Sequence, residues 1–430
     1  MRRRMAVVFV PLLAILSCGA ADVQKAVPLV GNLLEPHERL AGTAVAAKPP
    51  AVDICILENL PDGGKGCLWS SWGDGCLASN GRFYFAIGNH LEQIDGKGSG
   101  ESRIYEYNPE DRTVRVALNI RDVLTDPMID GGKIHARLEE AKDGWIYFVT
   151  HRGKSRTKDP AYKGSALIRF DPRSGKAEFL GVPVPGQTTP IAFLDPARLI
   201  MHCYAADSGD LVVYDVNARK IVWRGAGDSQ EGGRCMIFDA AGNAYFSTKD
   251  GALAMLARDG TLKTLPVRLP GDGAGKKGAA FLRAATRVSS RGVVYAATNS
   301  GRFFSFNTIT RELEDLGPSV AGGQYTAVLV LSPDEKYVYY APGSHGQAAG
   351  FGTPVVQYDI AARKHKVIAF LNAAARRQFN YNIAGTYATQ ISRDGADLYF
   401  CFNGAPVGSG RNDTFGKPCL VVVHIPPEER

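Results

Sequence analysis

The sequence predicts an all-β protein, a β-propeller, in which seven similar units close into a ring. Seven times along the chain an aromatic-rich apolar run follows a tight polar turn, and the runs recur every ~35 to 60 residues, which is the length of one four-stranded blade. The runs are 83–85, 145–148, 198–201, 243–246, 293–295, 337–340 and 398–400. Six or eight blades are the alternatives to seven.

Length and composition are consistent with one large domain. The chain has 430 residues, of which 45% are hydrophobic and 22% charged, as in ordinary globular proteins. A propeller of this length is a single domain because each blade packs only on its neighbours. We expect a signal peptide at 1–21, a Pro/Ala-rich linker at 22–51 and the propeller at 52–430.

The N-terminus has the three segments of a secretory signal. Arg2, Arg3 and Arg4 precede an apolar stretch at 5–16, and small residues follow at 17–21. We therefore expect export, to the periplasm, the extracellular space or the cell surface. Residues 15–18 also resemble a lipoprotein cleavage box. In that alternative, a lipid on Cys18 would be the protein's attachment to a membrane.

The charge favours an anionic ligand. The formal net charge of +7 becomes about +4 without the signal, because 47 basic residues then face 43 acidic ones. No basic run with interleaved aromatic residues is present, which argues against nucleic acid as a partner. We expect a monomer.

The blades can be assigned strand by strand. In blade two the expected strands are 134–139, 145–150, 166–170 and 177–181, and in blade three 190–194, 198–204, 211–214 and 220–223. The other units span about 72–120, 232–268, 280–317, 324–371 and 384–426. Turn segments at 108–111, 171–175 and 215–218 fall at equivalent places in three of the units.

The last unit lacks one strand. It supplies strands at 387–392, 398–402 and 420–425, whereas an unassigned strand at 52–58 lies before the first blade. Pairing 52–58 as the outer strand of the last blade would close the ring and remove its exposed edges. The sequence thus predicts a ring closed by an N-terminal strand.

Seven cysteines follow Cys18. Export permits disulfides, and the cluster Cys55, Cys67 and Cys76 is the expected source of one. No CxxC motif is present, so a thiol redox site or a cysteine-bound zinc has little support. Buried cysteines acting as small apolar residues are the alternative reading.

Polar residues recur where the innermost strands begin and where the second strands end, two places that lie near one mouth of a propeller's channel. The first set is Trp72, His135, Thr189 or Pro190, Arg234, Arg283, Tyr325 and Tyr387. The second set is His90, His151, His202 with Tyr204, Lys249, Asn299, His345 and Asn403. Five of the eight histidines fall in this part of the repeat. The sequence therefore predicts a cation-rich pocket with aromatic walls.

One chemistry suited to such a ring is β-elimination on an acidic sugar. It needs a cation to neutralise the carboxylate and an acid and a base that function near neutral pH. We assign His135, His151 and Tyr204 to catalysis. The expected substrate contacts come from Arg234, Arg283, Trp72, His90, Tyr325 and Lys249. Trp72 would stack on a sugar ring, with core packing as its alternative role.

A second chemistry is binding of a divalent metal. His135, His151, His202 and His345 could gather an ion such as Mn²⁺, Ca²⁺ or Zn²⁺, which would polarise a carbonyl or activate water. We assign His202 and His345 to the metal in particular. For each single histidine, a hydrogen-bonding role in the channel wall is the alternative.

Two segments carry a resemblance to known families. Residues 142–148 and 332–339 look like the repeats of the YVTN and quinoprotein-type propellers of exported bacterial proteins. The placing of His135 and His151 in one blade, with Tyr204 and Arg224 in the next, is similar to ulvan lyase-like and oligogalacturonate lyase-like enzymes. That resemblance implies cleavage of uronate-containing polysaccharides by β-elimination, in the second family with a bound divalent metal.

The function predicted from the sequence is accordingly an exported propeller that binds an anionic polysaccharide or oligosaccharide and acts on it as a polysaccharide lyase. The alternative from another class is a ligand- or protein-binding scaffold without catalysis at the cell surface. A propeller lactonase fits less well, because those sites use carboxylates and Asn around calcium, whereas this ring is rich in histidine.

Overall fold

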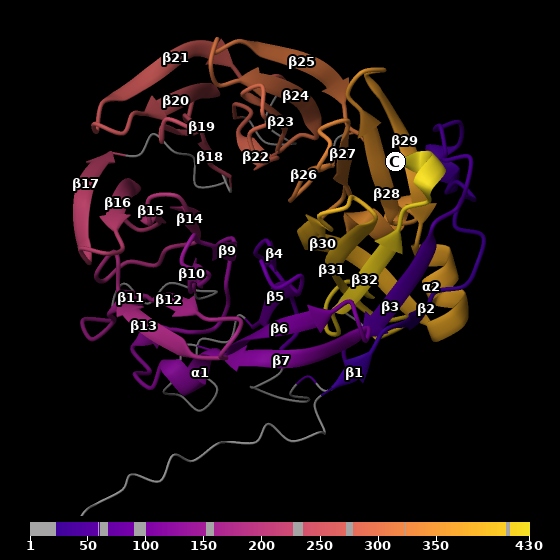
Figure 1. The fold of residues 1–430 in the computed structure, drawn as a ribbon, viewed down its shortest axis with the longest axis horizontal. Coiled ribbons are helices and arrows are strands. Elements are labelled where there is room, and N and C mark those ends of the chain that lie inside the picture. Colours follow the sequence, from indigo (N-terminus) through magenta and orange to yellow (C-terminus); the bar gives the residue numbers. More distant parts are fainter. Residues whose placement is uncertain are drawn as a thin grey trace, which may run out of the picture.

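The computed structural model describes residues 23–58, 60, 68–89, 100–151, 159–226, 235–271, 278–322, 324–409 and 413–430. Seven antiparallel sheets are arranged around a common axis, and each runs strand by strand from the axis to the rim (Figure 1). The predicted all-β, seven-bladed propeller is confirmed. The segment predicted to be a signal peptide, 1–21, with Cys18, lies outside the described residues.

The first three blades follow one another without interruption. Blade one consists of β4 (Cys76–Leu77), β5 (Phe83–Gly88), β6 (Ser102–Asn108) and β7 (Thr113–Asn119). Blade two consists of β9 (Glu139–Glu140), β10 (Ile146–Val149), β12 (Leu167–Phe170) and β13 (Ala177–Gly181). Blade three consists of β14 (Ile191–Asp195), β15 (Ile200–Ala205), β16 (Asp210–Asp215) and β17 (Lys220–Ala226). A parallel pair, β8 (Ile129–Asp130) with β11 (Gly164–Ser165), lies beside blade two.

The next three blades repeat the plan. Blade four consists of β18 (Ile237–Phe238), β19 (Ala244–Ser247), β20 (Ala252–Leu256) and β21 (Leu262–Arg268). Blade five consists of β22 (Leu282–Ala285), β23 (Val293–Thr298), β24 (Arg302–Asn307) and β25 (Leu313–Pro318). Blade six consists of β26 (Val330–Leu331), β27 (Tyr337–Tyr340), β28 (Pro354–Asp359) and β29 (Lys364–Phe370).

Blade seven is built from both ends of the chain. Its strands are β30 (Tyr381–Ile391), β31 (Asp397–Pro406), β32 (Cys419–His424) and, on the outside, β3 (Ala51–Ile56). β3 pairs with β32 from Ala51 opposite His424 to Ile56 opposite Cys419. The predicted closure by an N-terminal strand is therefore confirmed.

The segment expected to be a linker packs on the ring instead. β1 (Gln24–Lys25) pairs with β7 of blade one, and β2 (Val27–Pro28) pairs with β3 of blade seven. Farther along, Val45 bridges to Val367 of blade six. The segment thus runs across three blades at the closure, and its apolar side chains Leu29 and Leu33 are buried there.

The turn from the first to the second strand explains the polar signals in the sequence. In every blade this turn holds one residue with a positive φ, which an L-amino acid other than Gly adopts with strain. The seven residues are Gly81, Gly144, Leu199, Gly242, Gly292, Glu335 and Gly395. Glycine at five of the seven places is what the tight turns require.

The aromatic runs pack the blades against one another. Phe83 of blade one lies 5.8 Å from Tyr399 of blade seven, and Tyr245 of blade four lies 5.3 Å from Phe306 of blade five, measured between ring centroids. These separations are typical of favourable aromatic pairs. The repeat is therefore visible in the sequence because each second strand must fill the space between two sheets.

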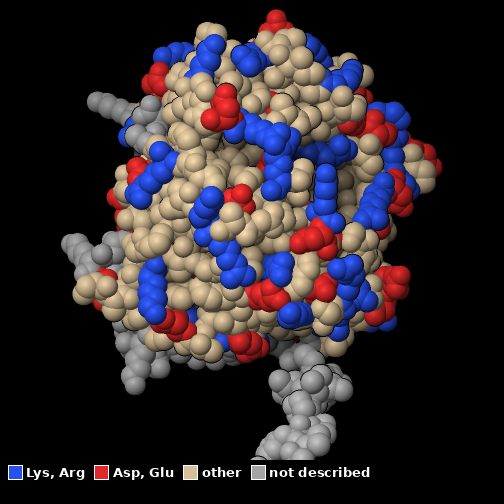
Figure 2. Space-filling model, turned by 60° about the vertical axis from the view of Figure 1, so that its left-hand side comes forward, with Lys and Arg blue, Asp and Glu red and all other residues tan. Residues whose placement is uncertain are grey.

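Short helices complete the fold. They are α1 (Ile120–Val123), α2 (Asn372–Phe379), η2 (Glu38–Leu40), η3 (Gln347–Phe351) and η5 (Pro427–Glu429). No helix within the described ranges is both long and apolar enough to cross a membrane. Over the face that Figure 2 shows, Lys and Arg cover more area than Asp and Glu, in keeping with the net positive charge.

Two local predictions differ from the structure. The innermost strand expected at 134–139 is confined to β9, because His135 and its neighbours leave the sheet to line the central channel. Cys55 and Cys76 are both free thiols and buried, so they do not form a disulfide with each other. Cys67, the third member of the predicted cluster, lies outside the described residues.

Candidate functional site

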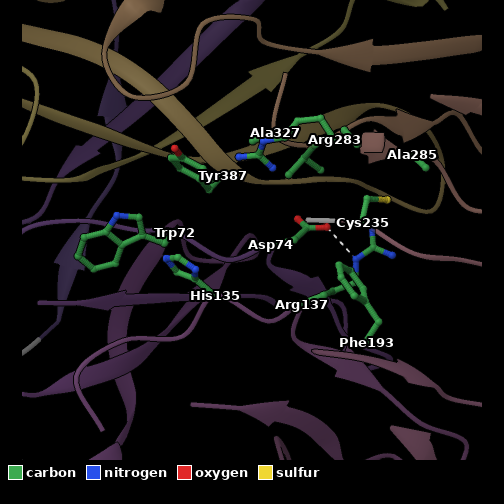
Figure 3. Close-up of a pocket in the computed structure, with 12 residues that line it drawn as sticks. Trp72, Asp74, His135, Arg137, Phe193, Cys235, Arg283, Ala285, Ala327 and Tyr387 are labelled. Atoms are coloured by element: carbon green, nitrogen blue, oxygen red, sulfur yellow. Dashed lines mark hydrogen bonds and ion pairs between the residues drawn. The ribbon is translucent and has the colours of Figure 1, made fainter. Parts of the chain in front are cut away.

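The channel on the ring axis holds a cavity of ≈ 30 Å³ to which every blade contributes. This volume has room for about one water molecule. The lining residues from blade one to blade seven are Trp72, Asp74, His135, Arg137, Phe193, Cys235, Arg283, Ala284, Ala285, Ala327, Val328 and Tyr387. Four residues of the first predicted set, Trp72, His135, Arg283 and Tyr387, are therefore brought together here (Figure 3).

A phenol and an imidazole from neighbouring blades meet beside this cavity. The Tyr387 hydroxyl oxygen on β30 lies 2.7 Å from Nδ1 and 2.9 Å from Nε2 of His345, which follows β27. The Tyr325 hydroxyl lies 2.9 Å from the Tyr387 hydroxyl and also hydrogen-bonds His345 Nδ1. We call Tyr325, His345, Tyr387 and Arg283 the mouth cluster. His345 is exposed, whereas Arg283 and Tyr387 are 5% and 2% exposed, so the cluster meets solvent mainly through the imidazole.

Arg283 supplies the positive charge of the mouth cluster. Its guanidinium carbon lies 4.5 Å from the ring centre of Tyr325 and 5.8 Å from that of Tyr387. The residue is only 5% exposed. Burial of a cation is costly, and the faces of the two phenol rings offset part of that cost by cation–π attraction. The charge is thereby fixed next to the two phenol rings.

The two histidines of blade two lie together on the other side. The ring centres of His135 and His151 are 4.7 Å apart. His151 is 9% exposed, and its Nδ1 lies 2.8 Å from the Thr188 hydroxyl. That hydroxyl in turn donates to the buried carboxylate of Asp130, which also accepts hydrogen bonds from Tyr162 and Ser165. The network holds the His151 ring in one orientation.

Aromatic rings form the remaining wall. Trp72 lies 6.2 Å from His135 and 4.9 Å from Trp69, between ring centroids. The ammonium group of Lys133 lies 4.5 Å above the Trp72 ring. Trp72 is only 5% exposed, so the stacking on a sugar ring that the sequence suggested has little free surface. Its observed role is to hold Lys133 and His135 in place.

An ion pair joins blades one and two in the wall of the cavity. Arg137 of blade two donates to Asp74 of blade one over 2.9 Å, and Asp74 also accepts from the backbone N–H of Thr389 in blade seven (Figure 3). Burial raises the pKa of Asp74, and Arg137 opposes this shift. Burial likewise raises the pKa of Glu139 to about 7. Asp74 and Arg137 thus line the same cavity as Arg283 and Tyr387 of the mouth cluster.

The structure does not bring all predicted residues to the mouth. His202 and Tyr204 lie on one face of β15, opposite Val213 and Leu211, and that face packs against blade four. Lys249 is exposed after the end of β19. His90 and Arg234 lie outside the described residues.

The predicted four-histidine metal site is not assembled. His135 lines the cavity, His151 contacts His135, and His345 hydrogen-bonds Tyr387, which also lines it. His202 instead contacts Phe238, with ring centres 4.9 Å apart, at the junction of blades three and four. Among the described residues, no group of three or more His, Cys, Asp or Glu side chains is placed to hold a metal ion.

Tyr387 is the main residue of the cluster to which the sequence assigned no role. It belongs to the set of residues at the starts of innermost strands, but nothing in the sequence distinguished it from a packing tyrosine. Lys133 and Asp130 gave no signal either, since they lie in the connection between blades one and two, Asp130 at the end of β8. The sequence pattern does not show which neighbours these side chains contact.

Comparisons with known proteins support the fold. No protein-family model matches the sequence, and no curated protein is similar to it in sequence. The structure of U3-55K aligns with a TM-score of 0.55 at 10% identity and covers 89% of this chain and 100% of its own. The WD40 repeats of RRP9 align with a TM-score of 0.53 at 9% identity, covering 89% and 99%. A chain of the mitotic checkpoint complex aligns with a TM-score of 0.54 at 10% identity, covering 92% and 98%.

The chain is a seven-bladed propeller. At identities of 9–10% these similarities establish the arrangement of the blades and not an activity.

Proposed function

We propose that the protein is an exported propeller that binds an anionic carbohydrate at the channel mouth and cleaves a uronate-containing polysaccharide by β-elimination. One observation carries the proposal: the Tyr387 hydroxyl is hydrogen-bonded to His345 and Tyr325 within reach of the Arg283 guanidinium. An acid, a base and a fixed positive charge are the three groups that this reaction requires.

The reaction breaks two bonds and forms one double bond. A base removes the proton at C5, next to the sugar carboxylate, and the electron pair left behind forms the C4=C5 double bond. The bond from C4 to the glycosidic oxygen breaks, and that oxygen takes a proton from an acid. No water is consumed, so the products are an unsaturated uronate and a chain with a new end.

The mouth cluster provides a group for each step. Arg283, which lines the cavity beneath the sugar, supplies a fixed positive charge that stabilises the negative charge developing on the carboxylate when C5 loses its proton. His345 accepts that proton, and the Tyr387 hydroxyl donates one to the leaving oxygen. The hydrogen bond between His345 and Tyr387 then returns the proton and restores the starting state.

The sugar would bind above the cavity rather than inside it. A volume of ≈ 30 Å³ excludes a pyranose ring, whereas His345 is exposed at the mouth. His135 and His151, to which the sequence assigned catalysis, then face the substrate from the opposite wall and are suited to hold its carboxylate. The resemblance to ulvan lyase-like and oligogalacturonate lyase-like enzymes supports the same substrate class.

The test is incubation of the full-length protein with a panel of polyuronates, followed by ultraviolet absorbance and mass spectrometry of the products. The proposal predicts an absorbing unsaturated uronate whose mass shows that no water was added. Parallel reactions with a chelator determine whether a divalent ion contributes. Saturated products of hydrolysis, or no cleavage of any member of the panel, would contradict lyase activity.

A second candidate is a binding scaffold without catalysis. The narrowness of the channel favours it, because a cavity of ≈ 30 Å³ gives no enclosed, water-free site for a sugar. In this case the polysaccharide would bind with measurable affinity and remain uncleaved. The H135A and H151A variants would then bind the polysaccharide more weakly. Neither the unaltered protein nor any variant would cleave it.

A further inference from the structure

A chain of aromatic rings joins the two walls of the channel mouth. It begins with His135 and Trp72, continues through Trp69 and Phe415, and ends at His345. The distances between successive ring centroids along this chain are 6.2, 4.9, 5.5 and 6.3 Å. Such separations are typical of aromatic rings in contact. We call these five residues the aromatic arc.

The two middle rings of the arc are better exposed than Trp72. Trp72, to which the sequence gave the stacking role, is only 5% exposed, whereas Trp69 and Phe415 are both half-buried. Because these two rings contact each other, they form one apolar surface beside the polar mouth cluster. Ligand sites commonly combine such a surface with a few polar groups.

The backbone holds Trp69 at the mouth end of blade one. Its N–H donates to the Gly88 carbonyl at the end of β5 over 3.1 Å, and its carbonyl accepts from the Gly416 N–H over 3.1 Å. Two residues later, the buried Asn403 amide of blade seven accepts from the Ser71 N–H over 2.8 Å and donates to the Ser71 carbonyl over 3.0 Å. The Trp69 ring is therefore attached to a rigid support, which lowers the conformational entropy lost when a ligand binds.

Phe415 is held against the turn that carries His345. Its neighbour Thr414 packs directly on Gly346, because a Cβ at Gly346 would lie 2.3 Å from Thr414 Cγ2. Gly346 also has a φ of 89°, which favours glycine. The Phe415 ring thereby contacts both the His345 imidazole and the Trp69 indole. The arc thus leads directly away from the proposed base.

We propose that Trp69 and Phe415 form a stacking platform for the sugar next to the reacting uronate. The apolar C–H face of a pyranose ring lies against the two rings, while the mouth cluster contacts the charged and polar groups of the reacting sugar. This assignment rests on the proposed function and adds the path of the polysaccharide, which runs from Tyr387 past His345 onto the platform. The stacking that the sequence assigned to Trp72 is thereby carried out by its neighbours.

The experiment measures how binding and cleavage depend on chain length, with the full-length protein and uronate oligosaccharides from the monosaccharide to the hexasaccharide. Isothermal titration of Y387F, which keeps every ring of the arc and should cleave slowly, gives the affinity. Initial rates of the protein with Tyr387 intact give kcat and KM. In both backgrounds we expect W69A and F415A to lose about tenfold of the affinity that longer chains gain. The kcat should stay within about twofold, since the platform binds the ground state and the transition state alike.

The matched control is W145A. It removes a half-buried tryptophan just before β10, whose ring lies 4.3 Å from the Arg169 guanidinium carbon and belongs to neither the arc nor the mouth cluster. W69F keeps a smaller flat ring and should retain part of the gain with chain length. Circular dichroism shows whether each variant is folded.

The outcomes separate the platform from the lyase activity. Affinity that does not rise with chain length in Y387F, or an equal rise in W69A, F415A and W145A, would overturn the platform even where cleavage is intact. Length-dependent binding that W69A removes, without cleavage of any polyuronate, would contradict the lyase activity and support the platform.

Discussion

The histidines at the channel mouth and the histidine between the blades differ in how far each lies beyond the turn of its blade. His151 is seven residues after Gly144, and His345 is ten residues after Glu335, the positive-φ residues of their turns. His202 is only three residues after Leu199. The first two have passed the end of the second strand, whereas His202 lies in the middle of β15.

This difference shows what controls access to the axis of a propeller. Within a strand, side chains alternate between two faces that both pack on neighbouring blades. On the second strands, the histidines at the mouth lie beyond the end of the strand, as His151 does after β10 and His345 after β27. Histidines that look equivalent in the repeat can thus be functional in one blade and part of the packing in the next.

The largest expected effect is a difference in turnover between a variant of a histidine at the mouth and a variant of the histidine between the blades. H345A should lower the turnover of a uronate polysaccharide at least ~100-fold, because a general base typically contributes that much. H202F should leave turnover within about twofold, since its side chain does not reach the mouth. Initial rates of unsaturated uronate formation measure both, at equal amounts of folded protein. Similar losses in the two variants would remove the distinction.

Arg283 should affect binding more than folding. R283Q keeps a planar polar group on the tyrosine rings but removes the charge, and hydrogen bonds to charged groups contribute about 1.5–3 kcal/mol. We expect the KM for the polysaccharide to rise about 10- to 100-fold with the melting temperature nearly unchanged. A matched control is R224Q, which alters an arginine paired with Asp210 on the outer strand of blade three. An equal rise in both variants would contradict the assignment.

His202 should make the protein sensitive to acid. Because its pKa in the folded protein is about 4, below the ordinary value near 6.5, the unfolded chain binds the proton more readily. The stability it contributes is present above pH 6.5 and is lost as the pH falls towards 4, by about 3 kcal/mol at most. Denaturant unfolding at pH 7 and pH 4.5 should show a smaller loss in H202F than in the unaltered protein.

His424 should show the opposite dependence and a smaller effect. Its Nδ1 lies 2.7 Å from Asp397 and its Nε2 3.2 Å from Asp53 of the closing strand β3. These carboxylates raise its pKa, so its stabilisation is complete below pH 6.5 and is lost as the pH rises through the raised pKa. With 39% of the side chain exposed, solvent screening keeps the effect below about 1 kcal/mol. H424Q should therefore cost more stability at pH 6 than at pH 9, and an equal cost at both would be the contrary result.

Much of the fold was predictable because the repeat imposes it on the sequence. Turn glycines such as Gly81 and Gly144 and aromatic residues such as Phe83 are needed in nearly every blade, and repetition makes weak local signals strong. The packing of residues 23–51 was not predictable. Its short strands β1 and β2 exist only through pairing with β7 and β3.

The site was predictable in part for the same reason. Trp72, His135 and Arg283 occupy equivalent places near the starts of innermost strands. Their positions in the repeat therefore place all three at the channel cavity. Partners such as Tyr387 for His345 depend on side-chain directions across a blade junction, which spacing does not encode. The exact length of β15 decided the position of His202, and strand ends are among the features that local patterns predict least well.

The most direct test of the central claim is the effect of one oxygen atom. Y387F removes the hydroxyl that joins His345 to Tyr325 and keeps the ring that packs beside Arg283. The measurement is the initial rate of unsaturated uronate formation by folded Y387F beside the unaltered protein. The proposed mechanism predicts a loss of at least ~100-fold. A rate within about twofold would show that the mouth cluster does not carry out the reaction.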